Sequence, residues 1–91
     1  MTESELNEIE SRLNNSTKGI WIPMIEGITH ESGSDFIMTN VKNSDDFNNP
    51  ERGRDIELHG GTKDDIFFIA NAKQDIQNLI KEIRKLKDNA R

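Results

Sequence analysis

The residues whose types and spacing are best suited to chemistry in this chain are a pair of glycines followed by a threonine and a lysine. They lie in His59-Gly60-Gly61-Thr62-Lys63, between a short extended segment and a long helical one. Adjacent glycines let backbone amides approach a phosphate closely, and a helix N-terminus favours an anion. Nearby arginines would contact phosphate oxygens, and a tryptophan would stack on a base. The candidate residues for binding a small nucleotide-like ligand are Trp21, Arg52, Arg54, His59, Gly60, Gly61, Thr62 and Lys63.

The same residues have a purely structural interpretation. Gly60-Gly61 could form only a tight turn from a strand into a helix, with the acidic pair Asp64-Asp65 already satisfying the helix dipole and repelling an anion. Trp21 is the one tryptophan of the chain, and in a chain so short of aromatic residues it would serve as a core anchor, packed against Phe67 or Phe68. Both interpretations remain open at the level of the sequence.

No other residues are arranged for catalysis. The two histidines, His30 and His59, lie near predicted turns and lack the nucleophile context of a serine or cysteine enzyme. The adjacent pairs Asp45-Asp46 and Asp64-Asp65 could hold a magnesium ion, but such pairs in a loop or at a helix start ordinarily face solvent. We therefore expect a protein that is not an enzyme and that carries no cofactor and no metal.

Size and composition favour self-association. The chain has 91 residues, enough for a single domain over 1–91, and hydrophobic and charged residues each make up 32% of it. A core this thin needs disulfides, a metal or oligomerisation, and the chain has no cysteine. The net charge of −5 argues against general nucleic-acid binding. No apolar run approaches the roughly 20 residues that span a bilayer, and the N-terminus is acidic, so we expect a cytoplasmic protein without membrane contact.

Hydrophobic periodicity predicts an α+β fold with a short N-terminal helix, a small antiparallel sheet of about three strands and a long C-terminal amphipathic helix used for oligomerisation. The helices occupy 1–15 and 62–88, and the sheet and its loops occupy 19–59. Thr2 and Glu5 form a capping-box pattern, and Thr62 is the expected N-cap of the last helix. Pro23 cannot donate to a strand ladder, which indicates an edge strand or a bulge. Turns are expected at Gly27 and at 30–34, and a loop at 42–53.

The C-terminal helix carries one continuous apolar seam. Its residues alternate three and four positions apart and form the predicted oligomer interface: Ile69, Ala72, Ile76, Leu79, Ile83 and Leu86. Isoleucine at the a-like positions and leucine at the d-like positions favour two parallel helices. The seam is shorter than a free coiled coil needs, so part of the helix must cover the sheet and the first helix. We expect a homo-oligomer, most simply a dimer. A separate helix start at Asp75 is an alternative to one continuous helix.

Charge is distributed unevenly between the two ends. Residues 1–15 carry four glutamates and one arginine, whereas residues 81–91 carry five basic and two acidic residues. This distribution complements the dipole of each helix. It also predicts that the acidic first helix lies beside the basic last helix, within one subunit or between subunits.

Two sequence blocks together resemble the Ead-type early-region accessory proteins of phages and prophages. The first, Thr17-Lys18-Gly19-Ile20-Trp21, stands where that family has Thr-Pro-Gly-Pro-Trp, with both prolines replaced. The second is the run 65–72, Asp-Ile-Phe-Phe-Ile-Ala-Asn-Ala, followed by Asp-Ile-Gln-Asn-Leu-Ile at 75–80, where Gln77 replaces the usual proline. The resemblance implies a phage or prophage origin among non-essential genes that adjust host processes. It implies no catalytic residue and no cofactor.

These observations lead to three functional hypotheses. The first is a non-enzymatic protein that counters host defence or physiology by sequestering a small nucleotide-like signal. The second is an inhibitor or adaptor that binds a host protein through the acidic first helix and loop 42–53, since charge complementarity speeds encounter and selects partners. The third is a structural or assembly protein with neither ligand nor host partner.

Overall fold

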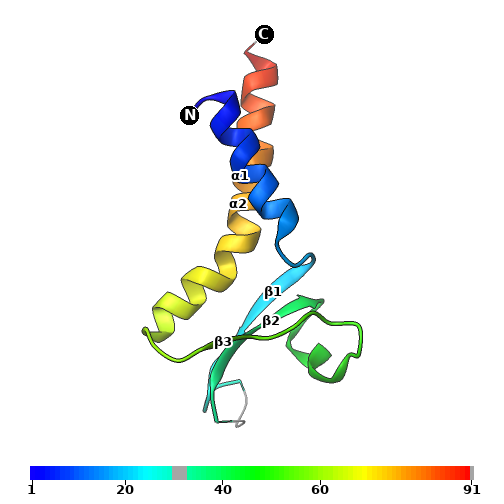
Figure 1. Cartoon of the computed structure of the whole chain (residues 1–91), viewed down its shortest axis with the longest axis vertical. Coiled ribbons are helices and arrows are strands. Elements are labelled where there is room, and N and C mark those ends of the chain that lie inside the picture. The colour runs from blue at the N-terminus through cyan, green and yellow to red at the C-terminus, as the bar shows by residue number, and fades with distance from the viewer. Residues whose placement is uncertain (30–32, 91) are drawn as a thin grey trace.

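The chain begins and ends with a helix, and a three-stranded antiparallel sheet lies between them (Figure 1). The computed structural model describes residues 1–29 and 33–90. The elements are α1 (Glu3–Asn15), β1 (Ile20–Met24), β2 (Asp35–Val41), a 3-10 helix η1 (Ser44–Asn48), β3 (Ile56–Leu58) and α2 (Lys63–Asn89). The predicted α+β fold is confirmed. The turn expected at 30–34, with His30, lies mostly outside the described residues.

Helix α1 begins where the capping box predicts. Thr2 Oγ1 accepts a hydrogen bond from the Glu5 amide at 3.1 Å, and the Thr2 amide donates to Glu5 Oε1 at 2.8 Å. Two amides that have no partner within the helix are thereby satisfied. The helix buries Leu6 completely. A helix of 13 residues is marginal alone, so contacts such as this burial are needed to hold it in place.

The sheet has the order β1-β2-β3, and its central strand is buried on both faces. On one face Phe36 and Met38 pack with Met24 and Val41. On the other face Ile37 packs with Ile25 and two residues of α2. Pro23 lies in the edge strand β1, which carries a bulge between Ile20 and Ile22, so both features expected of this proline's surroundings are present.

The 42–53 segment, expected to be loop almost throughout, contains the short helix η1. The Asn43 side chain caps it by accepting from the Asp45 amide at 2.8 Å. Phe47 of η1 meets Phe36 edge to face, with ring centroids 6.1 Å apart. Because Phe36 and Ile37 are consecutive in β2, they point to opposite faces of the sheet. The η1 segment therefore covers the face that α2 leaves open.

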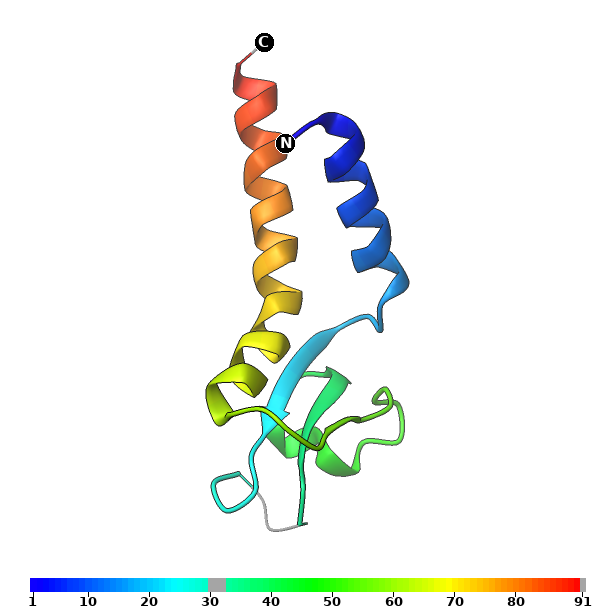
Figure 2. The same ribbon diagram turned by 60° about the vertical axis from the view of Figure 1, so that its left-hand side comes forward.

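Helix α2 is continuous for 27 residues, which corresponds to about 40 Å. Its N-cap is Thr62, as predicted, and Asp65 completes a capping box there. The alternative of a second helix start at Asp75 is wrong. Gln77, unlike proline, supplies an amide hydrogen and keeps the helical hydrogen bonds unbroken. The first half of α2 crosses the sheet and the second half runs beside α1 (Figures 1 and 2). The molecule is elongated, with extents of 52 × 28 × 19 Å.

Two isoleucines test where the stability of this fold resides. Ile37 is fully buried at the centre of β2, whereas Ile28 is 64% exposed. We expect Ile37→Ala to lower the free energy of unfolding by about 2–5 kcal/mol, because it leaves a cavity. The matched Ile28→Ala change should cost less than about 0.5 kcal/mol. Urea unfolding followed by circular dichroism measures both, and equal losses for the two variants would contradict the assigned core.

Candidate functional site

The face of α2 that packs within the chain is not the predicted apolar seam. The buried residues of α2 are Ile66, Ala70, Lys73 and Ile80. Arg84 and Lys87, which pair with α1, are half-buried and extend this row, and the seam residues Ala72 and Ile83 are half-buried beside it. The row from Ile66 to Lys87 follows the same alternation of three and four, but is displaced by one position from the seam. One position on an α-helix is a rotation of about 100°. The seam is thus turned to the side of the helix and remains largely uncovered.

The exposure of the seam residues confirms this displacement. Leu79 and Leu86 are each 60% exposed, and Ile69 and Ile76 are also exposed. Phe68, on the flank of the seam, is 75% exposed. Several exposed large apolar side chains along one side of a helix are uncommon on a soluble monomer.

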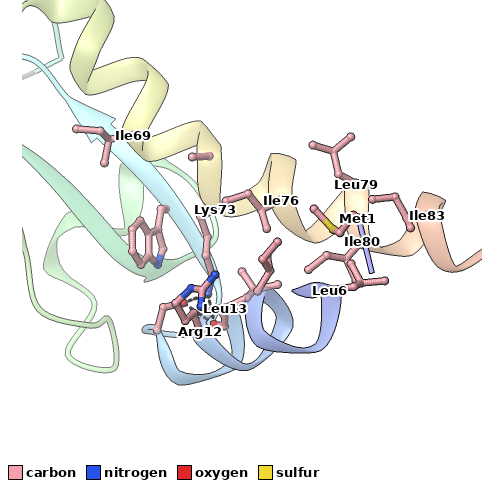
Figure 3. A pocket seen from close by; sticks show the side chains of 14 residues that line it. Met1, Leu6, Arg12, Leu13, Ile69, Lys73, Ile76, Leu79, Ile80 and Ile83 are labelled. Atoms are coloured by element: carbon pink, nitrogen blue, oxygen red, sulfur yellow. Dashed lines mark hydrogen bonds between the residues drawn. The ribbon is translucent and has the colours of Figure 1, made fainter. Parts of the chain in front are cut away.

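An apolar groove runs between α1 and α2 and includes most of the seam. Its volume is about 570 Å³. Leu6, Ile9 and Leu13 of α1 form one wall, and the other wall comes from α2 (Figure 3). Five of the six predicted interface residues line it: Ile69, Ala72, Ile76, Leu79 and Ile83. The groove therefore joins most of the predicted seam to the apolar stripe of α1, which the spacing of Leu6, Ile9 and Leu13 predicts.

One end of the groove is cationic. The Lys73 side chain is buried, and its Nζ donates to the Leu13 carbonyl at 3.3 Å and to Ser16 Oγ. Nζ also lies 5.4 Å from the centre of the Trp21 ring. Burial, and then the charge of Lys18, lowers the pKa of Lys73 from its ordinary value. Lys73 thus caps the C-terminus of α1, where a positive charge complements the helix dipole.

Trp21 is half-buried and packs against the core, as the structural interpretation expects, but its surroundings differ from those expected. The ring packs on the cluster that contains Ile66 and Ala70 of α2. Its Nε1 donates to the Thr17 carbonyl at 2.9 Å. Phe68 is largely exposed and Phe67 is 40% exposed, so neither phenylalanine contributes to the buried core. Helical rotation turns both side chains away from the face that carries Ile66 and Ala70.

The backbone of Trp21 is also tied to α2. The Trp21 amide donates to Gln74 Oε1 at 3.2 Å, and Gln74 Nε2 donates to the Trp21 carbonyl at 3.1 Å. The β-bulge at this position leaves strand groups without a ladder partner, and Gln74 satisfies them. The pair Trp21 and Gln74 therefore links the edge strand β1 to the middle of α2, beside the groove.

Ion pairs hold α1 against the C-terminal part of α2, away from Lys73. Arg84 contacts Glu3 at 3.0 Å and Glu10 at 2.9 Å, and it donates to Asn7 Oδ1 at 3.1 Å. Lys87 contacts Glu3 at 2.9 Å. The acidic first helix thus lies beside the basic last helix within one chain, one of the two arrangements that the charge distribution predicts. Hydrogen bonds from Lys87 and Arg84 lower the pKa of the Glu3 carboxyl below its ordinary value of 4.5.

The glycine segment forms a surface turn at the start of α2. Gly61 has a φ of +81°, a left-handed conformation that favours glycine. The Thr62 amide donates to Asp65 Oδ2 at 2.9 Å, and the Asp65 amide donates to Thr62 Oγ1 at 3.1 Å. Gly60, Thr62 and Lys63 are exposed. The structure brings this part of the predicted ligand site together, and the Asp65 carboxylate already accepts the hydrogen bond of the Thr62 amide.

The remaining predicted ligand residues lie in other surroundings. Arg52 pairs with Asp55 and stands 5.4 Å from the centre of the Phe47 ring, on the sheet face covered by η1. Trp21 packs on the face covered by α2. The structure therefore places Arg52 and Trp21 on opposite faces of the sheet. Arg54 is exposed just before β3, and His59 is exposed within 3.7 Å of Glu57.

Within residues 1–29 and 33–90, no three histidine, cysteine, aspartate or glutamate side chains gather in a way that would hold a metal ion. No helix in these same two ranges is both long and apolar enough to cross a bilayer. A comparison of the chain with family models, curated proteins and solved structures finds no significant match. The resemblance to Ead-type accessory proteins therefore stays a prediction.

The ion pairs at Glu3 make the docking of α1 dependent on pH. Because the pKa of Glu3 is lowered in the folded protein, its contribution to stability is present above pH 4.5 and is lost as the pH falls further. We expect the melting temperature of the native chain to fall more steeply between about pH 5 and about pH 3 than that of Glu3→Gln. Glu8, whose carboxylate makes no ion pair within the described ranges, provides the control Glu8→Gln. Parallel pH profiles for the native chain and Glu3→Gln would contradict this assignment.

Proposed function

We propose that this is a non-enzymatic binding protein that works as a homo-oligomer, most simply a dimer, assembled through the apolar seam of α2. The single observation that carries the proposal is the one-position displacement between the seam and the face that packs within the chain. Intramolecular packing uses the row from Ile66 to Lys87 and leaves Leu79 and Leu86 in solvent. A second apolar surface covering them would remove this area from water.

The composition supports the same proposal. The fully buried side chains of one subunit are few, and the arm formed by α1 and the second half of α2 holds only one completely buried α1 residue, Leu6. An arm with so little core gains stability when a second arm packs against it. The elongated shape leaves this arm accessible along its length (Figure 2).

A charge placed in the seam tests the assembly. We expect Leu79→Glu to convert a dimer into a monomer, because the added carboxylate would have to be buried in an apolar interface. Leu79 is already 60% exposed in the subunit, so the fold itself should persist. The control is Lys81→Glu, an exposed position off the seam where the charge change is larger. Size-exclusion chromatography with light scattering gives the mass of each variant. A native chain that is monomeric at micromolar concentration, or a Lys81→Glu variant that dissociates equally, would refute the proposal.

As the biological role of this oligomer, we propose sequestration of a small nucleotide-like signal of the host. Support comes from the accessible Gly60-Gly61 turn and from Arg54 and Lys63, which are exposed and make no ion pair within the described part of the chain. A Cβ on Gly60 would meet no atom within 4 Å, so the backbone there is open to a ligand. Asp65 opposes this role, because a phosphate would have to displace its carboxylate from the capped amide.

The alternative is a host protein bound through the acidic first helix and loop 42–53. Glu3 and Glu10 are neutralised by cations of α2, and Glu5 caps its own helix. This leaves Glu8 as the one α1 glutamate without a polar partner among the described residues. The acidic surface is thus smaller than the composition suggests, and the observations favour it less. A purely structural or assembly role would leave the oligomer with neither ligand nor host partner.

Native mass spectrometry of protein purified gently from a bacterial host separates these roles. For sequestration we expect an oligomer that carries additional mass of the size of a nucleotide, and calorimetry with the identified compound should show binding. Arg54→Ala and Lys63→Ala should each weaken that binding about tenfold, since each removes a charge-assisted contact. Lys81→Ala, a cation remote from the turn, is the control. An oligomer without bound ligand, with both variants silent in the host, would exclude sequestration.

A further inference from the structure

The exposed seam of α2 has two unlike flanks, and the difference determines how two copies can meet. With Ile69, Ile76 and Ile83 as a positions, the e flank contains Lys73, Ile80 and Lys87, which all contact α1. The opposite g flank contains Phe68, Asp75, Glu82 and Asn89, and all four are exposed. One side of the seam is therefore occupied by α1, and the other side is open and acidic.

An antiparallel pair of α2 helices would bring like charges together. In that arrangement g positions face g positions, so Asp75 of each subunit would lie opposite Glu82 of the other. The like charges would meet twice, once at each end of the two-fold interface. The repulsion between these carboxylates raises the free energy of the antiparallel dimer.

A parallel pair brings opposite charges together. In that arrangement each g flank lies beside the e flank of the other helix, and hence beside its α1. Glu82 then lies next to Lys87 of the partner subunit, which is 38% exposed and accessible beyond its contact with Glu3. Asp75 of one helix lies at nearly the same height along the helix axis as Lys73 of the partner subunit. Arg12 of α1 borders the groove at the level of Lys73, so Arg12 of the partner subunit comes near Asp75. Neither Arg12 nor Asp75 makes a side-chain hydrogen bond or ion pair within residues 1–29 and 33–90.

We propose that two copies of this chain associate through parallel α2 helices about a two-fold axis, with Arg12 of each subunit paired to Asp75 of the other. The inference rests on the proposed homo-oligomer and adds its orientation and one specific contact. The aliphatic a positions support it, since isoleucine at a with leucine at d favours two parallel strands. In this dimer the two sheets lie at the same end, and each α1 is enclosed between its own α2 and that of the other subunit.

Charge reversal tests the contact. We expect Arg12→Glu and Asp75→Arg each to raise the dissociation constant of the dimer about fivefold, in line with a partly exposed ion pair. The double variant Arg12→Glu/Asp75→Arg should return to within about twofold of the native value, because the pair is restored with reversed sign. Sedimentation velocity over a dilution series measures all four proteins. Additive weakening in the double variant would overturn the contact.

Cross-linking tests the orientation independently of the charges. The chain has no cysteine, so single thiols can be introduced without a background. Ala90 continues the a positions, and two parallel copies bring its Cα atoms within the 7 Å or so that a disulfide spans. In an antiparallel pair centred on the seam they would lie on the order of 35 Å apart. We expect Ala90→Cys to cross-link under mild oxidation and Lys81→Cys, on the outer side of α2, to stay unlinked.

The two proposals fail in different ways. A dimer by sedimentation in which Ala90→Cys does not cross-link would overturn the parallel orientation and leave the homo-oligomer intact. A protein that sediments as a monomer, with no cross-link, would overturn the homo-oligomer itself.

Discussion

The structure depends on how one helix divides its surface. Helix α2 presents one row of residues, from Ile66 to Lys87, to the sheet and to α1. A second, apolar row one position away lines the groove and is largely exposed, with Leu79 and Leu86 each 60% exposed. The first row is of mixed character, since Lys73, Arg84 and Lys87 belong to it and use their charges on α1. The second row is wholly apolar. The more apolar of the two rows is therefore the one that contributes less to packing within the chain, and this is the observation on which the proposed homo-oligomer rests.

Contacts of Trp21 with Gln74 and Lys73 fix the position of α1 and α2 relative to the sheet. Gln74 satisfies both backbone groups of the bulged residue, and Lys73 lies over the indole ring while it caps α1. Two consecutive residues of α2 thus fix a strand edge and the end of another helix. Buried polar groups that are fully paired in this way confer a single geometry on an otherwise small core.

Local signals in the sequence predicted the elements well. Thr2 with Glu5, and Thr62 at the start of α2, located helix starts because capping depends only on residues within one turn. Pro23 located an edge strand for an equally local reason. The groove was not predictable in this way. It arises from the orientation of α1 against α2, which is set by long-range contacts such as Glu3 with Arg84 and Leu13 with Lys73. A signal was nonetheless present: Lys73, Arg84 and Lys87 follow a helical row of their own beside the seam.

The contacts of α1 also have a consequence for the order in which the chain acquires its structure during synthesis. The side chains that hold α1 come from residues more than 50 positions later, with Glu3 bound to Arg84 and Lys87. Because α1 precedes α2 in the chain, α1 leaves the ribosome before the residues of α2 on which it docks have been made. Contacts so distant in sequence form late, after the loop between them has closed. Of the two helices, the one translated earlier is therefore packed only once the other is complete, whereas its capping box between Thr2 and Glu5 needs no residue of α2.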